Sequence, residues 1–535
     1  MQNIHASFLK TLRVLIVDDS STALLLIKQQ LISLGVSHSN IVTVERYQSA
    51  IKAMETHQFD VLILDYHLEQ YLTGYELAML LYRNRLISNT TGVLIISGDA
   101  RQETVLTALS GKIRHFITKP LSNNSLADKL YTIHRETQKL TQITEALHSG
   151  HKLSAANMFE LINRSGFNVS LEAYLLDYLM ANNHWEFLDI YITISSTPCH
   201  ASKMCAIAYL LHRDNSTKQA LEELHHFLTE NPLSIRVMDA LADIYAENRQ
   251  TENAALWATK AFELTPSIGE RAAKASQLNM QAHKRSQLLK VGQIYAQHMS
   301  LADINWLKTI IIHFQSLQSI YALSESTTAK TELVQHANQF LHFASKHLTP
   351  KRLQHLQAVV LLSHCHVLIH ENNDMLAHQK LLKSLSYFYD ELFECPPILL
   401  IEYLPALAFF GERQIHSTII NVLKIKGVTN LPPAEFEQFS PNNQSNLHFK
   451  QISYHDQSLG FIEHYPHSSE AKIQFIHNYS QKPSVNHSDK IKALISELTV
   501  LDLPPNWHNW LIAGKQHKFS QPPPLAFSIT TKDKK

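Results

Sequence analysis

Short apolar runs, each followed by a polar residue, organise the first 120 positions of this 535-residue chain. They cover residues 12–17, 61–64, 93–96 and 116–118, and a further run covers 41–44. Continuous Val, Ile and Leu runs of this length are typical of strands buried on both faces of a parallel sheet. The pattern therefore predicts five buried strands.

Between these runs the apolar residues change to helical spacing. Residues 20–34 place apolar side chains at positions 23, 24, 27, 31 and 34, with Ser20 or Ser21 available as N-cap. Similar patterns occupy 48–56, 73–83, 103–110 and 125–134. Alternating strands and helices predict an α/β domain with a doubly wound, five-stranded parallel sheet of the flavodoxin-like kind.

From Glu136 onward the strand signals fade, and amphipathic helical windows follow one another for roughly 300 residues. Prolines at 198, 232 and 266 repeat every 34 residues, which is the period of the tetratricopeptide repeat (TPR). Two stretches resemble this repeat in detail, with small residues where paired helices approach and a proline that ends the second helix. The predicted packing positions are Met204, Ala208, Ala220 and Pro232 in one stretch and Leu241, Ala242, Tyr245, Ala254, Ala261 and Pro266 in the other.

The neighbouring stretches fit the repeat less well. Glu186 stands at a small-residue position before Pro198, and no closing proline follows the stretch after Pro266. Because about three repeats are needed for stable stacking, we interpret these neighbours as degenerate repeats. The alternative is an irregular helical bundle with coincidental prolines. The favoured prediction is an all-α, TPR-like superhelical region.

Helical patterns continue at 331–348, 351–371, 373–393 and 398–426, then weaken beyond Pro432 apart from 488–501. The proline-rich and lysine-rich end is typical of a disordered tail. The expected organisation is a doubly wound domain at 11–135, a helical linker at 136–165, TPR-like repeats at 166–300, further helical repeats at 301–433, a C-terminal region of undefined fold at 434–515 and a disordered tail at 516–535.

Composition narrows the function classes. Lys plus Arg and Asp plus Glu both number 47, so the formal net charge is zero. The chain therefore has no excess of positive charge that would attract nucleic acid or an anionic membrane surface. The N-terminus lacks a signal-peptide pattern, and the apolar stretch 396–410 is too short to span a bilayer. Four cysteines form no CxxC pair, which argues against a disulfide framework or a zinc ribbon. These features predict a soluble cytoplasmic protein without membrane or nucleic-acid partners.

Polar residues at the ends of the apolar runs supply candidate chemistry: Asp18, Asp19, Asp65, Ser97 and Lys119. The carboxyl ends of parallel strands meet at one edge of a sheet, so we expect these side chains to share one pocket. Three carboxylates would repel one another unless a cation neutralised them, and oxygen ligands favour Mg²⁺ or Mn²⁺. With an ammonium group and a hydroxyl beside them, the set predicts an aspartyl-phosphate site.

The same residues lie in motifs of a known family. Val17-Asp18-Asp19-Ser20, Leu64-Asp65, Ile96-Ser97-Gly98 and Thr118-Lys119-Pro120-Leu121 occur in the family's order and approximate spacing. Residues 11–135 thus resemble the receiver domain of bacterial two-component response regulators. One departure is that Gly74 arrives one residue late, so the loop after the third strand is expected to be reshaped.

The resemblance implies a role for each of these residues. Asp65 would accept a phosphoryl group from a histidine kinase or a phosphotransfer protein. Asp19, Asp65 and the backbone carbonyl of His67 would ligate Mg²⁺, with Asp18 assisting through water. Lys119 would bind the phosphoryl group, and Ser97 and Phe116 would be the switch positions.

The expected function is a phosphorylation-controlled response regulator whose TPR region binds a signalling protein. No enzymatic activity is expected beyond self-phosphorylation and autodephosphorylation of the receiver. One alternative is a regulator that dephosphorylates or inhibits another signalling protein. Another is a transcription regulator with an unrecognised DNA-binding unit after residue 434. Formation of a homodimer stays open.

Overall fold

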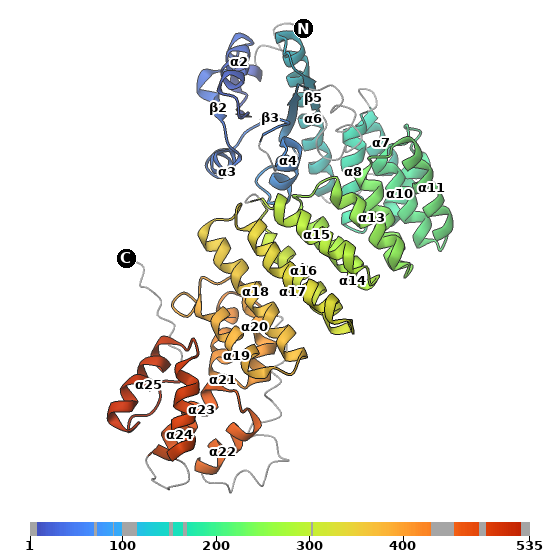
Figure 1. Cartoon of the computed structure of the whole chain (residues 1–535). Helices are drawn as coiled ribbons and strands as arrows, with labels where there is room; N and C mark the ends of the chain where they lie inside the picture. The colour runs from blue at the N-terminus through green and yellow to red at the C-terminus, as the bar shows by residue number, and fades with distance from the viewer. Residues whose placement is uncertain are drawn as a thin grey trace. The chain divides into compact units, whose positions relative to one another are not determined.

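The computed structural model describes residues 8–68, 72–88, 90–98, 115–148, 154–163, 168–300, 303–429, 454–480 and 488–525. The chain divides into two compact units, residues 1–309 and 310–535. In the first unit, alternating strands and helices give way to paired helices (Figure 1). The second unit is helical throughout the residues that are described.

The five predicted strands are present and form one parallel sheet in the order β2-β1-β3-β4-β5. The first strand begins at Val14 rather than at residue 12, because the Leu12 N–H bonds the carbonyl of Phe8 and closes a helical turn there. The strands are β1 (Val14–Val17), β2 (Ile41–Val44), β3 (Val61–Asp65), β4 (Gly92–Ser97) and β5 (His115–Thr118).

Helices cover both faces of this sheet, which confirms the doubly wound prediction. Apolar residues of α2 (Ser21–Ser33) and α6 (Asn123–His148) pack with alternate residues of the strands in one core. Contacts from α3 (Tyr47–Thr56) and α4 (Gly74–Arg83) to the strands cover the sheet as well. Ser20 is the N-cap of α2, since its side chain accepts a hydrogen bond from the Ala23 N–H. The helix predicted at 103–110 lies outside the described residues.

The last helix of the sheet domain is longer than predicted. The pattern indicated an end near residue 134, whereas α6 continues to His148. Its second half buries Leu140 and Ile143 against the following helices, including α7 (Ala155–Asn163). A continuous helix therefore crosses the expected boundary at 135.

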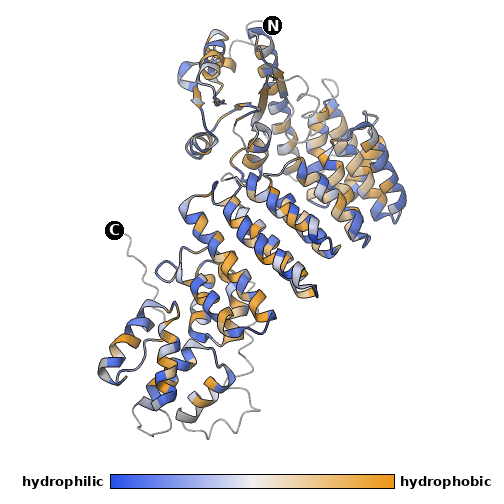
Figure 2. Cartoon of the chain, in the orientation of Figure 1, coloured by the Kyte–Doolittle hydropathy of each residue, from blue (hydrophilic) through white to orange (hydrophobic). Residues whose placement is uncertain are grey.

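Helix pairs with a regular period follow. The helices α10, α12 and α14 begin at residues 201, 235 and 269, and α11, α13 and α15 begin at 217, 251 and 285, so each series repeats every 34 residues. Apolar and polar stripes alternate around these helices (Figure 2). The pairs are α8 (Val169–Ala181) with α9 (Trp185–Ile194), α10 (Ala201–Arg213) with α11 (Thr217–Glu230), α12 (Ile235–Glu247) with α13 (Thr251–Glu263), and α14 (Gly269–Gln281) with α15 (Arg285–His298).

Most of the predicted packing residues of these pairs are buried. Ala208, Ala220, Leu241, Ala242, Tyr245, Ala254 and Ala261 are among them. Met204 and Pro266 are half-buried, and Pro232 is exposed in the turn after α11. The two prolines thus lie in turns between helices rather than in the helix contacts. The architecture is all-helical with a 34-residue period, and its assignment to the TPR family stays a prediction.

The second unit contains more helices than the sequence pattern indicated. The stretch 398–426 is split by Gly411, whose positive φ of 75° ends the first of two helices. Beyond residue 517, Phe519 is buried against Trp510, whereas most other described residues of the expected disordered tail are exposed. No described helix is long and apolar enough to cross a membrane. The helices are α16 (Trp306–Leu323), α17 (Thr327–Ala344), α18 (Pro350–His370), α19 (Asp374–Ser386), α20 (Pro397–Phe410), α21 (Arg413–Ile425), α22 (Tyr454–His464), α23 (Ser469–Ser480), α24 (Ser488–Thr499) and α25 (Pro505–His517).

Candidate functional site

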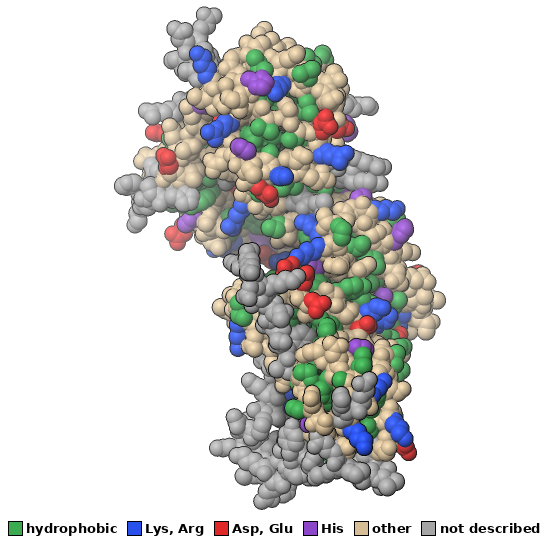
Figure 3. Space-filling view, turned by 90° about the vertical axis from the view of Figure 1, so that its left-hand side faces the viewer, with side chains coloured by type: hydrophobic (Ala, Val, Ile, Leu, Met, Phe, Trp, Pro, Cys, Tyr) green, Lys and Arg blue, Asp and Glu red, His purple; other side chains and the backbone are tan. Residues whose placement is uncertain are grey.

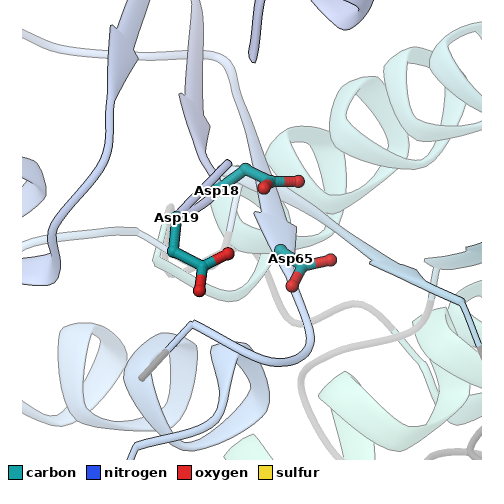
Figure 4. A group of neighbouring side chains, drawn as sticks. All are labelled: Asp18, Asp19 and Asp65. Atoms are coloured by element: carbon teal, nitrogen blue, oxygen red, sulfur yellow. The ribbon is translucent and has the colours of Figure 1, made fainter. Parts of the chain in front are cut away.

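Three aspartates gather at the carboxyl ends of neighbouring strands (Figure 4). Val17 of β1 pairs with Leu64 of β3, so the next residues, Asp18 and Asp65, lie level with each other. Together with Asp19, they offer carboxylate oxygens that all lie within 4.8 Å of one another. Asp18 and Asp65 are buried, whereas Asp19 is exposed. An all-oxygen donor set of this kind, open to solvent on one side, suits a hard divalent cation such as Mg²⁺.

A single lysine bridges the two buried carboxylates. Lys119 follows β5, and its Nζ lies 2.9 Å from Asp18 Oδ2 and 2.8 Å from Asp65 Oδ1. Backbone donors hold the remaining oxygens. The Ser20 N–H lies 2.9 Å from Asp18 Oδ1, and the His67 N–H lies 3.0 Å from Asp65 Oδ2. The carboxylates are therefore fixed in place by four contacts.

Burial and charge shift the proton affinities of this site. Desolvation raises the pKa of Asp65, and the nearby Asp18 charge adds to this, while Lys119 and the His67 N–H oppose it. Burial acts to lower the pKa of Lys119, but its hydrogen bonds and ion pairs with Asp65 and Asp18 raise it overall. The lysine therefore stays charged beside the two acids.

The remaining predicted site residues lie on β4, on β5 and in the loop after β3. Ser97 is the fully buried last residue of β4, and its carbonyl accepts a hydrogen bond of 2.7 Å from the Lys119 N–H. Phe116 is half-buried in the adjacent strand β5. His67 follows Asp65 by two residues, in the loop that leads from β3. The topology thus brings Ser97 and Lys119 to the end of the sheet where the aspartates lie, whereas Phe116 lies two residues before the end of β5.

Comparisons with known proteins identify the family of the sheet domain. Residues 14–131 match the response regulator receiver domain family, so this part of the chain is a CheY-like receiver domain. The chemotaxis protein CheY of Pseudomonas aeruginosa is 25% identical over 122 residues, which cover 23% of this chain and 95% of that protein. A receiver domain structure of the Francisella response regulator 1452 is 23% identical and covers 23% of this chain and 98% of its own, with a TM-score of 0.21.

The surface charges form no single-sign area on the face drawn in Figure 3. Lys and Arg side chains alternate with Asp and Glu side chains over the described residues of that face. This mixture agrees with the formal net charge of zero. It provides no extended basic surface on that face for a nucleic-acid backbone.

One residue beside the site has a role that the sequence motif did not reveal. Gly74, the first residue of α4, donates its N–H to the Tyr66 carbonyl at 2.9 Å. A Cβ atom at Gly74 would lie 2.1 Å from the backbone carbonyl oxygen of Asp65. The start of α4 therefore packs directly on the backbone of Asp65, and only glycine fits.

Substituting Gly74 with alanine is expected to destabilise the receiver domain by about 1–3 kcal/mol, because the added Cβ meets backbone that cannot move freely. Faster amide hydrogen exchange in β3 and β4 of the full chain would measure this loss. Gly98→Ala is the matched control, since a Cβ there meets no atom within 4 Å. Equal exchange in the two variants would contradict the prediction.

Proposed function

We propose that this protein is a phosphorylation-controlled response regulator in which Asp65 accepts the phosphoryl group. The observation that supports this most is the arrangement of Asp65 itself. It is buried, level with Asp18, close to Asp19, and 2.8 Å from the Lys119 ammonium. A carboxylate beside fixed positive charge and further acidic oxygens has the surroundings that phosphoryl transfer needs.

In the proposed reaction the donor is a phosphorylated histidine of a kinase or phosphotransfer protein. A carboxylate oxygen of Asp65 forms a bond to phosphorus while the bond from phosphorus to the imidazole nitrogen breaks, and the nitrogen keeps the electron pair. Lys119 then pairs with an oxygen of the transferred group, and the Ser97 hydroxyl donates a hydrogen bond to another. Phe116, on the strand beside Ser97, is the proposed aromatic switch position.

The acidic cluster fits a divalent cation. Asp18, Asp19, Asp65 and the backbone carbonyl of His67 would hold Mg²⁺ or Mn²⁺, since their carboxylate oxygens are grouped within 4.8 Å. When bound, such an ion supplies positive charge that neutralises the oxygens of the phosphoryl group. Lys119 provides one positive charge for three carboxylates, so a divalent cation would balance the remaining negative charge.

We further propose that the paired helices α8–α15 are the output and bind a partner protein in the manner of TPR arrays. The 34-residue period of α10–α15 supports this. Cross-repeat ion pairs such as Arg271 with Asp239 at 2.9 Å and Lys274 with Asp243 at 2.7 Å stabilise the stack. The bound partner is expected to be another signalling protein, and its affinity is expected to depend on phosphorylation.

Phosphorylation of the full chain by a small-molecule phosphodonor with Mg²⁺ tests the proposal. Intact-mass spectrometry is expected to show one added phosphoryl group in the wild type and none in Asp65→Asn. Asp60→Asn is the matched control, because Asp60 is exposed five residues earlier and its side chain accepts a hydrogen bond from the Arg13 N–H, away from the acidic cluster. Phosphoryl incorporation that persists in Asp65→Asn would refute the assignment.

A further inference from the structure

The receiver domain contacts the paired helices through α4, within the first compact unit. Tyr75 and Glu76 of α4 are buried, with exposed fractions of 4% and 6%. Glu76 Oε1 accepts a hydrogen bond of 3.3 Å from the Ser267 N–H, which precedes α14. At the other end of α4, Arg83 Nη1 lies 2.6 Å from Glu270 Oε2. We call this set of residues the α4 contact.

The helical side of the α4 contact is already held in place by its own ion pairs. Tyr75 lies in the electrostatic field of Arg271 and Arg236. Arg271 pairs with Asp239, and Arg236 pairs with Asp177. Each arginine thus has an acidic partner within the helical region. The surface near Tyr75 is therefore balanced in charge and is held in place by these ion pairs.

The same helix touches the candidate phosphoacceptor. Gly74 packs on the Asp65 carbonyl, as described above, and lies two residues before Glu76. Glu76 Oε2 accepts hydrogen bonds from the Thr73 N–H and hydroxyl at 3.2 and 3.0 Å. The Glu76 N–H donates to Thr73 Oγ1 at 3.2 Å and completes the capping box of α4. One carboxylate therefore holds both the turn beside Asp65 and the Ser267 N–H.

The charge of Glu76 also reaches the neighbourhood of Asp65. Burial raises the pKa of Tyr66, the residue after Asp65, and the charge of Glu76 raises it further. A phosphoryl group adds about 1.5–2 negative charges at neutral pH. A phosphoryl group on Asp65 would repel the buried carboxylate of Glu76. The contacts seen for the Glu76 oxygens are with N–H and hydroxyl groups rather than with a cation.

We propose that α4 couples the receiver to the paired helices, and that phosphorylation of Asp65 weakens the Glu76–Ser267 hydrogen bond and loosens the α4 contact. This inference rests on the proposed function of Asp65. It assigns the coupling to α4, which packs on β3 and β4, rather than to β5, where Phe116 lies. Release of α4 would free the N-terminal ends of α12 and α14 to change their packing.

Amide hydrogen exchange of the full chain, with and without beryllium fluoride and Mg²⁺, tests the inference. Beryllium fluoride is a probe that mimics a phosphoryl group on a carboxylate. Exchange at residues 267–271 is expected to become about tenfold faster on its addition, in line with the loss of a hydrogen bond to a charged group. Protection at residues 17–19 and 65–68 reports in the same experiment whether the probe has bound.

Two failures are distinguishable. If residues 17–19 and 65–68 do not respond, the proposed function of Asp65 fails. If they respond while residues 267–271 keep their exchange rate or become slower, only the coupling through α4 is overturned. The wild-type protein with and without beryllium fluoride therefore distinguishes the two failures, and no variant is needed.

Paired variants sharpen the assignment to Glu76. Glu76→Gln removes the charge, so exchange at 267–271 is expected to be fast already and to lose its response to beryllium fluoride. Glu270→Gln makes the same chemical change in the same contact at a side chain that is 67% exposed. It is expected to respond as the wild type does, because exposed ion pairs contribute little. A wild-type response in Glu76→Gln would overturn the inference.

Discussion

Replacing Lys119 with methionine is expected to lower the free energy of unfolding of the receiver domain by about 2–3 kcal/mol without divalent cations. Methionine keeps the length of the side chain but removes the charge that bridges Asp18 and Asp65. Both carboxylates are buried, and two uncompensated buried charges repel each other and resist desolvation. The estimate lies below that for a fully buried pair because Lys119 is 33% exposed.

The variant should also acquire a strong dependence on Mg²⁺. An ion that binds the folded domain and not the unfolded chain stabilises it in proportion to the logarithm of its concentration, and the loss of the lysine charge favours such binding. Amide exchange of β1 and β3 in the full chain, titrated with magnesium chloride, measures both effects. Lys52→Met is the control, since Lys52 is exposed on α3. A Lys119→Met variant as stable as this control, or one insensitive to Mg²⁺, would contradict the expectation.

The receiver domain and its site could be predicted from the sequence because their determinants are local. Each strand is a short apolar run, and each site residue directly follows or ends one, so the rule that parallel strands end at one edge was enough to group Asp18, Asp65 and Lys119. The α4 contact could not be found this way. Glu76 and Ser267 are 191 residues apart, and neither lies in a motif that points to the other.

Some helices were missed because their burial is not one-sided. The helix α23 buries Ser469, Glu470, Lys472 and Asn478 together with its apolar residues, so it shows no amphipathic stripe. Two acidic side chains link this helix to residues distant in sequence. Glu412 accepts from the Ser469 N–H at 2.6 Å, and Glu470 accepts from the Gln414 N–H at 2.9 Å, so each acid caps the other's helix. Such reciprocal caps exist only after the helices have packed.

The end of α6 was misplaced for a different reason. The periodic apolar pattern continues past residue 134 without a glycine or proline to end the helix. Glu136 then joins both sides of the expected boundary. Its Oε2 lies 3.1 Å from His115 Nε2 in the sheet, and its Oε1 accepts from Asn168 Nδ2 at 2.7 Å, just before α8. The receiver and the first helices are thus built on one shared helix.

Acidification is expected to destabilise the second compact unit through buried histidines. His313 and His336 lie in contact, with 3.1 Å between their Nε2 atoms, and both are buried. Burial lowers the pKa of His336 to about 4 and holds that of His313 well below its usual range. Burial, with Lys351 and Arg352, likewise lowers the pKa of His355 to about 4. Below pH 6.5 the unfolded chain therefore binds more protons than the folded unit.

The stabilisation by neutral histidines is present above pH 6.5 and is lost as the pH falls toward 4. Each of these histidines should lower the free energy of unfolding by about 1.4 kcal/mol per pH unit in that window, or about 2 kcal/mol at pH 5. Glu470 acts in the opposite direction, because burial raises its pKa to about 7. The net loss is therefore smaller than the sum over the histidines, and single variants must separate the contributions.

His336→Gln keeps a hydrogen-bonding side chain and removes the titration. Urea unfolding at pH 7.5 and pH 5, followed by tryptophan fluorescence with Trp507 and Trp510 buried in the second unit, should show a pH-dependent loss about 2 kcal/mol smaller than in the wild type. His342→Gln is the matched control on the same helix, because His342 is exposed. If both variants keep the wild-type difference between the two pH values, the burial of a neutral His336 is not what makes this unit sensitive to acid.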